Sequence, residues 1–392
     1  MSDKPTAVII GAGFTGCALA YDLTLRGFAV TVVDRGEICN GTSGRTHGLL
    51  HSGARYCVND PEAALECIKE NIILRRIARQ CIEFNQGFFL AITDEELAFK
   101  DEFQKGAEEA GIPVRWMNAK EILTLEPAIN PGVLGGFEVP DGSFDPLRLA
   151  LAFAASAKNR GARFMAYHEV DSIHVNGQST VDFITMIDRT TGLNIDLHAD
   201  IFINACGAWA GHIASLAGVD VPVIPCPGVM VAFNKRMTER VLNRLSLPGD
   251  GDIIIPQRRM SVIGTTSFEV SDADYIPVDH DQVKTMVNRA VEMIPAIDKV
   301  GIRASYMSAR PLIQTNSDAR SLSRTFKCFD HQAANNIRGF VTITGGKATT
   351  CRMMAEKTAD VVCAQLGINA PCFTAETELA PYRTFYSEQV TQ

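Results

Sequence analysis

Residues 7–34 read AVIIGAGFTGCALAYDLTLRGFAVTVVD, and this stretch decides the fold. It opens with four apolar residues, a short run that is typical of a buried parallel strand. A glycine-rich turn at 11–16 comes next, followed by an apolar stretch at 17–25 with the period of a helix. A second apolar run at 29–33 ends at Asp34. The order strand, glycine turn, helix, strand and acid predicts a Rossmann-like βαβ unit.

Each part of this unit has a physical role in holding a dinucleotide. Gly11 permits the tight turn, Gly13 lets the backbone approach a pyrophosphate, and Gly16 lets the helix pack close to the strand. The helix N-terminus offers N–H groups and a positive dipole end to the phosphates. Asp34 can accept hydrogen bonds from an adenosine ribose and would repel a 2′-phosphate, which argues against NADP. The alternative is a glycine turn in an unrelated α/β protein.

The rest of the chain favours FAD over NAD. NAD enzymes of this type usually continue as consecutive βα units, but here the pattern breaks at a loop rich in glycine and hydroxyl groups, residues 41–48. Two later strand–glycine junctions lie at 201–209 and 341–349. The helix predicted over 348–365 would aim its positive N-terminus at the ligand, where it would stabilise an anionic reduced flavin. Three such junctions predict one large cofactor, FAD.

These segments supply the predicted cofactor contacts, and we expect no metal site. The contacts are Gly11, Gly13, Phe14, Thr15, Gly16, Asp34, Arg35, Thr42, Ser43, Arg45, Thr46, His47, Gly48, Val170, Ala205, Gly207, Trp209, Gly345, Gly346, Lys347, Ala348 and Thr349. A covalent link between the flavin and His47 or His51 has no support in the sequence.

Composition excludes several classes of protein. The chain has 392 residues, long enough for two domains, and its 46% hydrophobic content is that of a folded globular protein. Its net charge of −8 and lack of a basic block argue against nucleic-acid binding. No apolar run reaches about 18 residues, so we expect no transmembrane helix. The N-terminal apolar run is broken by glycines and makes a poor signal peptide.

The cysteines point to a reduced, cytoplasmic protein. There are 11 of them, and no pair has the CxxC spacing of a zinc ribbon or an iron–sulfur cluster. An odd number in a chain of this size favours free thiols, which are typical of the cytosol.

The predicted fold class is α/β, with a Rossmann-like FAD-binding domain and a second, mainly antiparallel β substrate domain. We expect the FAD-binding domain to be discontinuous, at 1–80, 140–220 and 325–392. The substrate domain takes 81–139 and 221–324, where short apolar runs predict strands.

Several motifs together resemble the family of FAD-dependent glycerol-3-phosphate dehydrogenases, within the wider group that includes D-amino-acid oxidase. The likeness is closest to the catalytic A subunit of the anaerobic bacterial enzyme. The segments that carry it are GAGFTG at 11–16, GRTHGLLHSGARY at 44–56, VPDG at 139–142, IGTT at 263–266, ARPL at 309–312 and ITGGK at 343–347. The resemblance spans residues 5–375, and the segment 44–56 is its most specific part.

The resemblance departs from the family at the C-terminus. In the anaerobic enzyme the catalytic chain carries a further region with clustered cysteines, whereas this chain stops at Gln392. We therefore expect electrons to leave through a quinone or a partner subunit that supplies the missing function. Such a partner would place the protein peripherally at the inner membrane.

The resemblance also implies a set of substrate-binding residues. It places Arg55, Tyr56, Arg310 and Arg324 at the substrate, and gives Arg310 and Lys347 catalytic roles. The planar fork of Arg matches a phosphate through two parallel hydrogen bonds. The alternative for each Arg is ordinary surface charge, and for Lys347 a solvated first-turn position.

Oxidation of a secondary alcohol also needs a base for the hydroxyl proton. We expect His51 to be this base, since an unperturbed imidazole has a pKa of ~6.5. The other interpretation is a hydrogen-bonded histidine that orients FAD or the loop. His47 is expected to contact the cofactor.

The implied reaction is oxidation of sn-glycerol 3-phosphate to dihydroxyacetone phosphate, by hydride transfer to flavin. One alternative is a related flavin dehydrogenase or oxidase for a polyol, a 2-hydroxy acid or an amine, because Arg binds a carboxylate as readily as a phosphate. A second is a non-catalytic flavin-bearing subunit that relays electrons. Reduction of the flavin by each candidate substrate distinguishes them.

Overall fold

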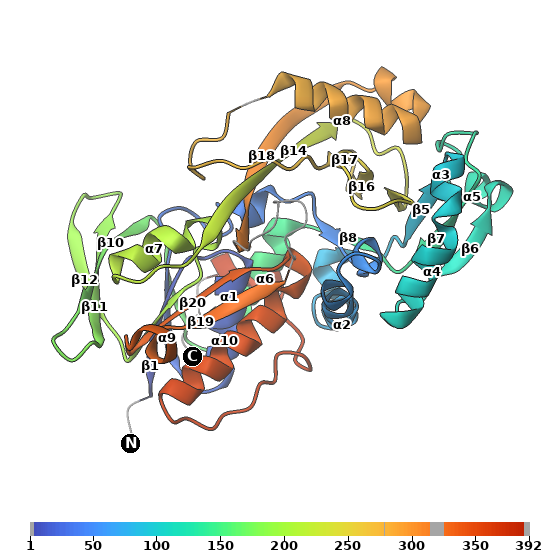
Figure 1. Ribbon diagram of the computed structural model, residues 1–392. Coiled ribbons are helices and arrows are strands. Elements are labelled where there is room, and N and C mark those ends of the chain that lie inside the picture. The colour runs from blue at the N-terminus through green and yellow to red at the C-terminus, as the bar shows by residue number, and fades with distance from the viewer. Residues whose placement is uncertain (1–3, 278, 314–324, 388–392) are drawn as a thin grey trace.

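The computed structural model describes residues 4–277, 279–313 and 325–387. Figure 1 shows two large sheets in different parts of the molecule. Strands β1, β19 and β20 lie with helices α1, α6 and α10 in the lower part, while β14, β18 and α8 lie above them. Strands β5, β6 and β7 lie to the right with helices α3, α4 and α5.

The first sheet is a mainly parallel, six-stranded sheet. In spatial order its strands are β19 (Phe326–Asp330), β20 (Phe340–Gly345), β13 (Ile201–Asn204), β1 (Thr6–Ile10), β2 (Ala29–Val33) and β9 (Arg163–Met165). All neighbours are parallel except β19 and β20. Strand β1 connects to β2 on one side and pairs with β13 on the other, so the strand order reverses here. Ligands of such sheets bind at this switch point, outside the carboxyl ends of the strands.

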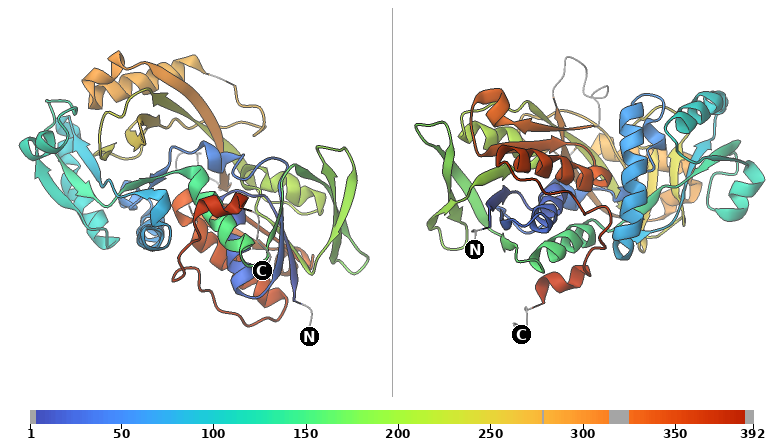
Figure 2. Two further views of the ribbon diagram at one scale, coloured as in Figure 1. Left: turned by 180° about the vertical axis from the view of Figure 1, so that it is seen from behind. Right: turned by 90° about the horizontal axis from the view of Figure 1, so that it is seen from below.

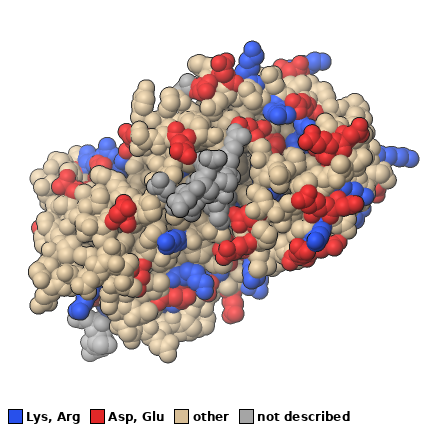
Figure 3. All heavy atoms as spheres, in the orientation of Figure 1, with Lys and Arg blue, Asp and Glu red and all other residues tan. Residues whose placement is uncertain are grey.

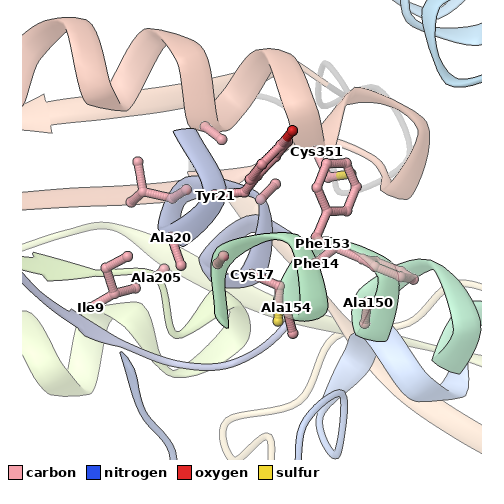
Figure 4. Packing of buried hydrophobic residues seen from close by; sticks show 14 of the residues in the cluster. Ile9, Phe14, Cys17, Ala20, Tyr21, Ala150, Phe153, Ala154, Ala205 and Cys351 are labelled. Atoms are coloured by element: carbon pink, nitrogen blue, oxygen red, sulfur yellow. The ribbon is translucent and has the colours of Figure 1, made fainter. Parts of the chain in front are cut away.

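Both faces of the parallel sheet are buried, which explains the continuous apolar run of β1. Ala7 and Ile9 face helices α1 (Phe14–Leu25), α6 (Pro146–Lys158) and α10 (Cys351–Gln365). Figure 4 shows Ile9, Cys17 and Phe153 among the buried residues of this layer. Side chains alternate between the faces of a strand, so Val8 and Ile10 pack on the opposite face.

That opposite face is covered by a small antiparallel sheet and a short helix. They are β10 (His168–Val175), β11 (Val181–Asp188), β12 (Asn194–His198) and α7 (Ala210–Leu216). Val170, Ile184 and Ile213 pack against β1 and β13 from this side. The parallel sheet is therefore the middle layer of three.

The second large sheet has eight strands and is antiparallel except where β15 pairs with β5. In spatial order they are β18 (Ile302–Ile313), β14 (Val223–Phe233), β17 (Met260–Gly264), β16 (Ile253–Gln257), β15 (Val241–Arg244), β5 (Gly87–Ala91), β7 (Gly135–Val139) and β6 (Arg115–Asn118). Val229, Val231 and Phe233 of β14 pack toward α8 (His280–Met293), while Met230 points to the other face. One face of this sheet is thus left for a cavity.

A third region joins the two sheets. Strands β3 (Leu49–Leu50), β8 (Gly142–Phe144) and β4 (Ile82–Glu83) form a small sheet beside helix α2 (Pro61–Ile77). Seen from below in Figure 2, α2 stands between the parallel-sheet layers and the group of α3 to α5. The remaining helices are α3 (Asp94–Ala98), α4 (Lys100–Glu109), α5 (Ala119–Leu125) and α9 (His331–Asn335). Short 3₁₀ turns span Thr42–Arg45, Ala54–Tyr56, Arg79–Cys81, Gly207–Trp209, Pro295–Lys299, Ala348–Thr350 and Tyr382–Tyr386.

The structure confirms the predicted fold class. The strands of the two large sheets come from the two sets of ranges predicted for the two domains, although the division into domains itself stays a prediction. The helix predicted over 348–365 differs at its start: its first three residues form a 3₁₀ turn, and α10 begins at Cys351.

Two further expectations concern the surface. In the described parts of the chain, no helix is long and apolar enough to cross a membrane. On the face drawn in Figure 3, Lys and Arg side chains are interspersed with Asp and Glu and form no continuous basic surface.

Candidate active site

Two adjoining cavities open at the carboxyl ends of β1, β13 and β20. We call the first, of ≈ 390 Å³, the Lys347 cavity, and the second, of ≈ 1290 Å³, the Asp34 cavity. Both are lined by Gly13, Thr42, Ser43, Ala205 and Gly207. The two cavities therefore form one elongated groove, which suits a long cofactor with two chemically different ends.

The glycine turn of residues 11–16 is required by close backbone contacts. Gly11 has a φ of +106°, and a Cβ there would lie 2.7 Å from the carbonyl oxygen of Ala205. A Cβ on Gly16 would lie 1.8 Å from the carbonyl oxygen of Gly11, so only glycine lets α1 pack against the turn. Gly13 precedes α1 and provides no side-chain cap. The helix N-terminus thus faces the groove with its positive dipole end, which fits a pyrophosphate.

Asp34 lines its cavity and also holds the glycine turn. Its Oδ2 accepts a hydrogen bond from the Ala12 amide at 2.7 Å, and its Oδ1 accepts one from the Gly36 amide at 2.9 Å. Burial raises the pKa of Asp34, against these hydrogen bonds that lower it. A carboxylate has about four lone-pair positions. The Asp34 carboxylate can therefore accept further hydrogen bonds from the ribose that the sequence predicts.

Arg35 is engaged by a residue that sequence reasoning missed. Its Nη1 donates to Asp274 Oδ2 at 3.0 Å, and its second terminal nitrogen also donates to that carboxylate. The guanidinium lies 4.7 Å from the centre of the Trp209 ring. Asp274 comes from the segment between β17 and α8, 239 residues along the chain, and it lines the Asp34 cavity. No local pattern in the sequence could have paired it with Arg35.

The Lys347 cavity brings together the predicted catalytic residues. It is lined by His47, His51, Arg55, Tyr56, Arg310 and Lys347. Sequence reasoning missed the polar residues Asn59, Asp60, Thr265, Thr266, Ser267 and Ser308 in the same lining. The motif at 263–266 carried a signal for two of them, but its residues were not assigned to the site.

Both histidines are neutral at neutral pH. Burial, with smaller effects from Arg310 and Arg55, lowers the pKa of His47 to about 3. Burial also lowers the pKa of His51 well below its ordinary value, assisted by His47, Arg55 and Lys347. The His51 ring, whose residue is 8% exposed, lies 5.4 Å from the Tyr56 ring. An uncharged imidazole can accept a proton, so the required protonation state of a base is present.

The two histidines differ in their hydrogen bonds. His47 Nδ1 accepts from the Leu49 amide at 3.1 Å, which places the proton of the neutral ring on Nε2. His47, which lines the Lys347 cavity, therefore carries a hydrogen-bond donor at Nε2. Among the described residues, neither ring nitrogen of His51 has a hydrogen-bond partner. His51 keeps a lone pair for a ligand.

Two of the three predicted substrate-binding arginines are held by different acceptors. Arg55 donates to both carboxylate oxygens of Asp252 at 2.8 Å, and to the Gly249 carbonyl at 3.2 Å. Arg310, on β18, donates to the hydroxyl of Thr265 and to the carbonyl of Thr266 at 3.2 Å. Both guanidinium groups are fixed in place by the protein before a ligand binds.

Lys347 follows two glycines that have positive φ, Gly345 at +87° and Gly346 at +69°. The turn directs its side chain across the cavity, and Nζ lies 5.1 Å from the centre of the Tyr56 ring. The amide of Lys347 donates to Thr350 Oγ1 at 3.1 Å, which anchors the start of the 3₁₀ turn. Lys347 and Ala348, the first residue of the 3₁₀ turn before α10, thus line the same cavity.

Most predicted contacts line one of the two cavities, and three do not. Gly16 packs α1 against the turn, Gly48 is buried beside Gln257, and Thr349 Oγ1 accepts a hydrogen bond from the His51 amide at 3.1 Å. Arg324 lies outside the described residues. In the part of the chain that the structure describes, no group of three or more His, Cys, Asp or Glu could hold a metal ion.

Known proteins share both the sequence and the fold. The family model described as FAD dependent oxidoreductase matches residues 6–360. The A subunit of the anaerobic glycerol-3-phosphate dehydrogenase of Escherichia coli (strain K12) is 39% identical over 382 residues, which is 96% of this chain and 70% of that protein. The A1 subunit of the same enzyme from Haloferax volcanii is 38% identical, over 97% of this chain and 67% of that protein.

Solved structures show the same fold. A glycerol-3-phosphate dehydrogenase from Bacillus halodurans complexed with FAD has a TM-score of 0.75 at 24% identity, covering 96% of this chain and 68% of that one. An L-α-glycerophosphate oxidase from Mycoplasma pneumoniae with FAD bound has a TM-score of 0.76 at 18% identity, covering 96% and 99%. The groove, its glycine turn and these likenesses agree: the chain belongs to the family of FAD-dependent oxidoreductases, with FAD as its cofactor.

Proposed function

We propose that this protein oxidises sn-glycerol 3-phosphate to dihydroxyacetone phosphate. The observation that carries the proposal is the Lys347 cavity, where a neutral His51 lies with the cations Arg310 and Lys347 in one part of the cofactor groove. When bound, FAD supplies the acceptor for the hydride of the substrate C–H bond. The relatives named as glycerol-3-phosphate dehydrogenases support the choice of substrate.

In this proposal His51 takes the hydroxyl proton as the C–H bond breaks. Its low pKa makes it a weak base, so the alkoxide that develops must be stabilised in another way. Arg55 and Lys347, which help to lower the pKa of His51, provide that stabilisation, because their positive charges favour a negative charge at the same place. The Nε2–H of His47 adds a hydrogen-bond donor on this side of the cavity.

The phosphate would bind to the cationic part of the cavity. Arg310 and Lys347 supply charge-assisted hydrogen bonds, which are stronger than neutral ones. Arg55 and Tyr56 would border the substrate, with the guanidinium of Arg55 held in place by Asp252. A role for Arg324 at the substrate stays a prediction.

The route of the electrons out of the protein is part of the proposal. The relatives are named as one lettered subunit of an enzyme, which supports an electron-accepting partner chain, with a quinone as the alternative. Such a partner would hold the protein peripherally at the membrane. Co-purification with tagged protein tests this, and recovery of the chain alone under mild conditions would count against a stable partner.

The substrate is tested by mixing the FAD-loaded protein anaerobically with sn-glycerol 3-phosphate, glycerol, a 2-hydroxy acid and glycine. We expect sn-glycerol 3-phosphate to bleach the visible flavin absorption at the lowest concentration. Equal bleaching by glycerol would favour a polyol dehydrogenase, and bleaching by the acid or the amine would favour those substrates. No bleaching by any of them would favour an electron-relay protein.

A further inference from the structure

The main chain around His51 lies where a strand pairing ends. In the small sheet, Leu49 of β3 pairs with Ser143 of β8, and Leu50 pairs with Gly142. The register therefore brings Asp141 opposite His51, one position beyond the last strand pair. The Asp141 side chain continues the hydrogen bonding there, because its Oδ1 accepts from the Ser52 amide at 2.7 Å.

A second buried side chain holds the same segment from helix α2. Asn71 is 1% exposed, and its Nδ2 lies 3.0 Å from the His51 carbonyl oxygen and 3.3 Å from that of Leu50. The same nitrogen lies 3.1 Å from the Pro140 carbonyl oxygen, so Asn71 joins the His51 segment to the residue before Asp141.

The orientation of the Asn71 amide is fixed by Arg75, one helical turn further along α2. Arg75 Nε donates to Asn71 Oδ1 at 2.7 Å, so the amide nitrogen must point to the carbonyl groups. Arg75 also donates to the carbonyl oxygens of Pro140 at 2.9 Å and Asp141 at 2.8 Å. The side chains of Asn71 and Arg75 thus bind the main chain next to β3 and β8, where the pairing of these two strands ends.

As a result, the main chain of His51 is held on every side. Its amide donates to Thr349 Oγ1 at 3.1 Å, its carbonyl accepts from Asn71, and the next amide donates to Asp141. The ring, by contrast, has no hydrogen-bond partner among the described residues. The position of the ring in the cavity therefore depends on the main chain that carries it.

Burial of the Asp141 carboxylate at this position is unfavourable for the stability of the fold. It is 2% exposed, and its carboxylate accepts from the Ser52 amide and from Asn243 Nδ2, the latter at 3.2 Å to Oδ2. Burial raises the pKa of Asp141, while the Ser52 amide and hydroxyl, Asn243 and the charge of Arg75 lower it. Burying a carboxylate away from water is unfavourable unless hydrogen bonds compensate. The cost is balanced here by the hydrogen bonds that fix the segment after His51.

From this geometry we infer that Asn71 and Asp141 are positioning residues, which hold the His51 backbone so that its ring reaches the substrate hydroxyl. The inference rests on the proposed function of His51. A displacement of about 1 Å in a reacting group can cost roughly 100-fold in rate. Loosening the segment should therefore slow the reaction while the cofactor stays bound.

The test uses the FAD-loaded protein and the anaerobic rate of flavin reduction by saturating sn-glycerol 3-phosphate. We expect Asp141→Ala and Asn71→Leu each to lower this rate about 10- to 100-fold. The substrate concentration for half-maximal rate and the FAD content should stay unchanged. Asp141→Asn should keep most of the rate, since its amide oxygen can accept from Ser52. Asn243 Oδ1, which has no hydrogen-bond partner within the described ranges, can accept from the amide nitrogen of the new side chain.

Glu126 provides the matched control. It is also a buried carboxylate that accepts main-chain amides, from Glu239 at 3.0 Å and Arg240 at 2.8 Å, but it does not line either cavity. Glu126→Ala should lower thermal stability and leave the rate unchanged. If Asp141→Ala does not fold, Asn71→Ser takes its place in the same comparison.

The pH dependence of the rate gives a second readout that a merely structural role would not move. A loosened His51 becomes more hydrated and its pKa rises toward ~6.5, so the acid side of the rate profile should shift to higher pH in Asp141→Ala. An unshifted profile with an unchanged rate overturns the inference. An equally slow Asp141→Asn also overturns it, because charge and not position would then matter.

His51→Asn separates this inference from the proposed function. If His51→Asn reduces the flavin at the normal rate, the proposed role of His51 fails. If His51→Asn is inactive but Asp141→Ala and Asn71→Leu are fast, only the positioning inference fails.

Discussion

The Asp34 cavity and the Lys347 cavity adjoin in one groove but are built in different ways. The first rests mainly on close backbone contacts, Gly11 against Ala205 and Gly16 against Gly11, and on the hydrogen bond from the Ala12 amide to the Asp34 carboxylate. The second rests on side chains from widely separated segments that fix one another. Backbone contacts tolerate no added atom, whereas the side-chain cavity depends on charge and protonation. Substitutions in the two cavities should therefore fail in different ways.

The largest expected effect is in the Lys347 cavity. His51→Asn removes the proposed proton acceptor and should lower the rate of flavin reduction by about 10²- to 10⁴-fold, the usual contribution of a general base. FAD content should be unchanged, because His51 does not line the Asp34 cavity. Stopped-flow reduction under anaerobic conditions measures the rate. His174→Asn, on the small sheet of β10 to β12, is the control, and a similar loss there would show that the effect is not specific.

Next in size is the loss of a charge from the same cavity. Arg310→Ala should weaken binding of sn-glycerol 3-phosphate by about 10- to 150-fold, as expected for charge-assisted hydrogen bonds worth roughly 1.5–3 kcal/mol. Arg310→Lys should recover only part of the lost affinity for sn-glycerol 3-phosphate, since Lys lacks the planar fork of donors. Arg303→Ala, at an exposed position of the same strand, is the matched control. If glycerol and its phosphate lose affinity equally, Arg310 is not the phosphate ligand.

The corresponding change in the glycine turn should act on folding and not on chemistry. The Cβ of Gly16→Ala would lie 1.8 Å from the Gly11 carbonyl oxygen, so α1 must shift. We expect a loss of about 1–3 kcal/mol in the free energy of unfolding, together with weaker FAD binding. Urea unfolding measures the first. Gly177→Ala, where a Cβ meets nothing within 4 Å, should be neutral. Wild-type stability in Gly16→Ala would contradict the close packing of α1.

The same contrast explains what the sequence could predict. The βαβ unit was readable because steric limits select glycine at fixed spacing and because β1 is buried on both faces. Asp274 and Asp252 were not readable, since their arginine partners lie 239 and 197 residues away and nothing in the local sequence marks an acid as paired. Asp141 belonged to a motif already noted, but its role appears only with the register of β3 and β8. The distant partner of a charged side chain can be identified only from the three-dimensional fold.

Low pH should change the stability of the folded protein differently through His47 in the Lys347 cavity and through Asp34 in the Asp34 cavity. The pKa of His47 falls to about 3 in the folded protein, below its ordinary 6.5, so the unfolded chain binds more protons between these values. Stability should therefore fall as pH drops below 6.5, by at most about 1.4 kcal/mol per pH unit for this group. His47→Asn should reduce the slope of melting temperature against pH. Asp34→Asn should not reduce it, since burial raises the pKa of Asp34 and its protonation costs the fold nothing.

The smallest effect is expected at the edge of the Asp34 cavity. Asp274→Asn keeps a hydrogen-bond acceptor for Arg35 but removes the ionic part of the pair, whose side chains are 35% and 53% exposed. Pairs this exposed contribute about 0.2–1 kcal/mol, so the dissociation constant of FAD should rise by no more than about five-fold. The cation–π contact of Arg35 with Trp209 remains and limits the loss of affinity.

Fluorescence titration of the apoprotein with FAD at low and high salt measures this dissociation constant. High salt should shrink the difference between Asp274→Asn and the unmodified protein, because ions screen exposed pairs. A loss as large as that of Gly16→Ala would mean that this side-chain contact, and not the backbone, controls cofactor binding, and the contrast between the two cavities would not hold.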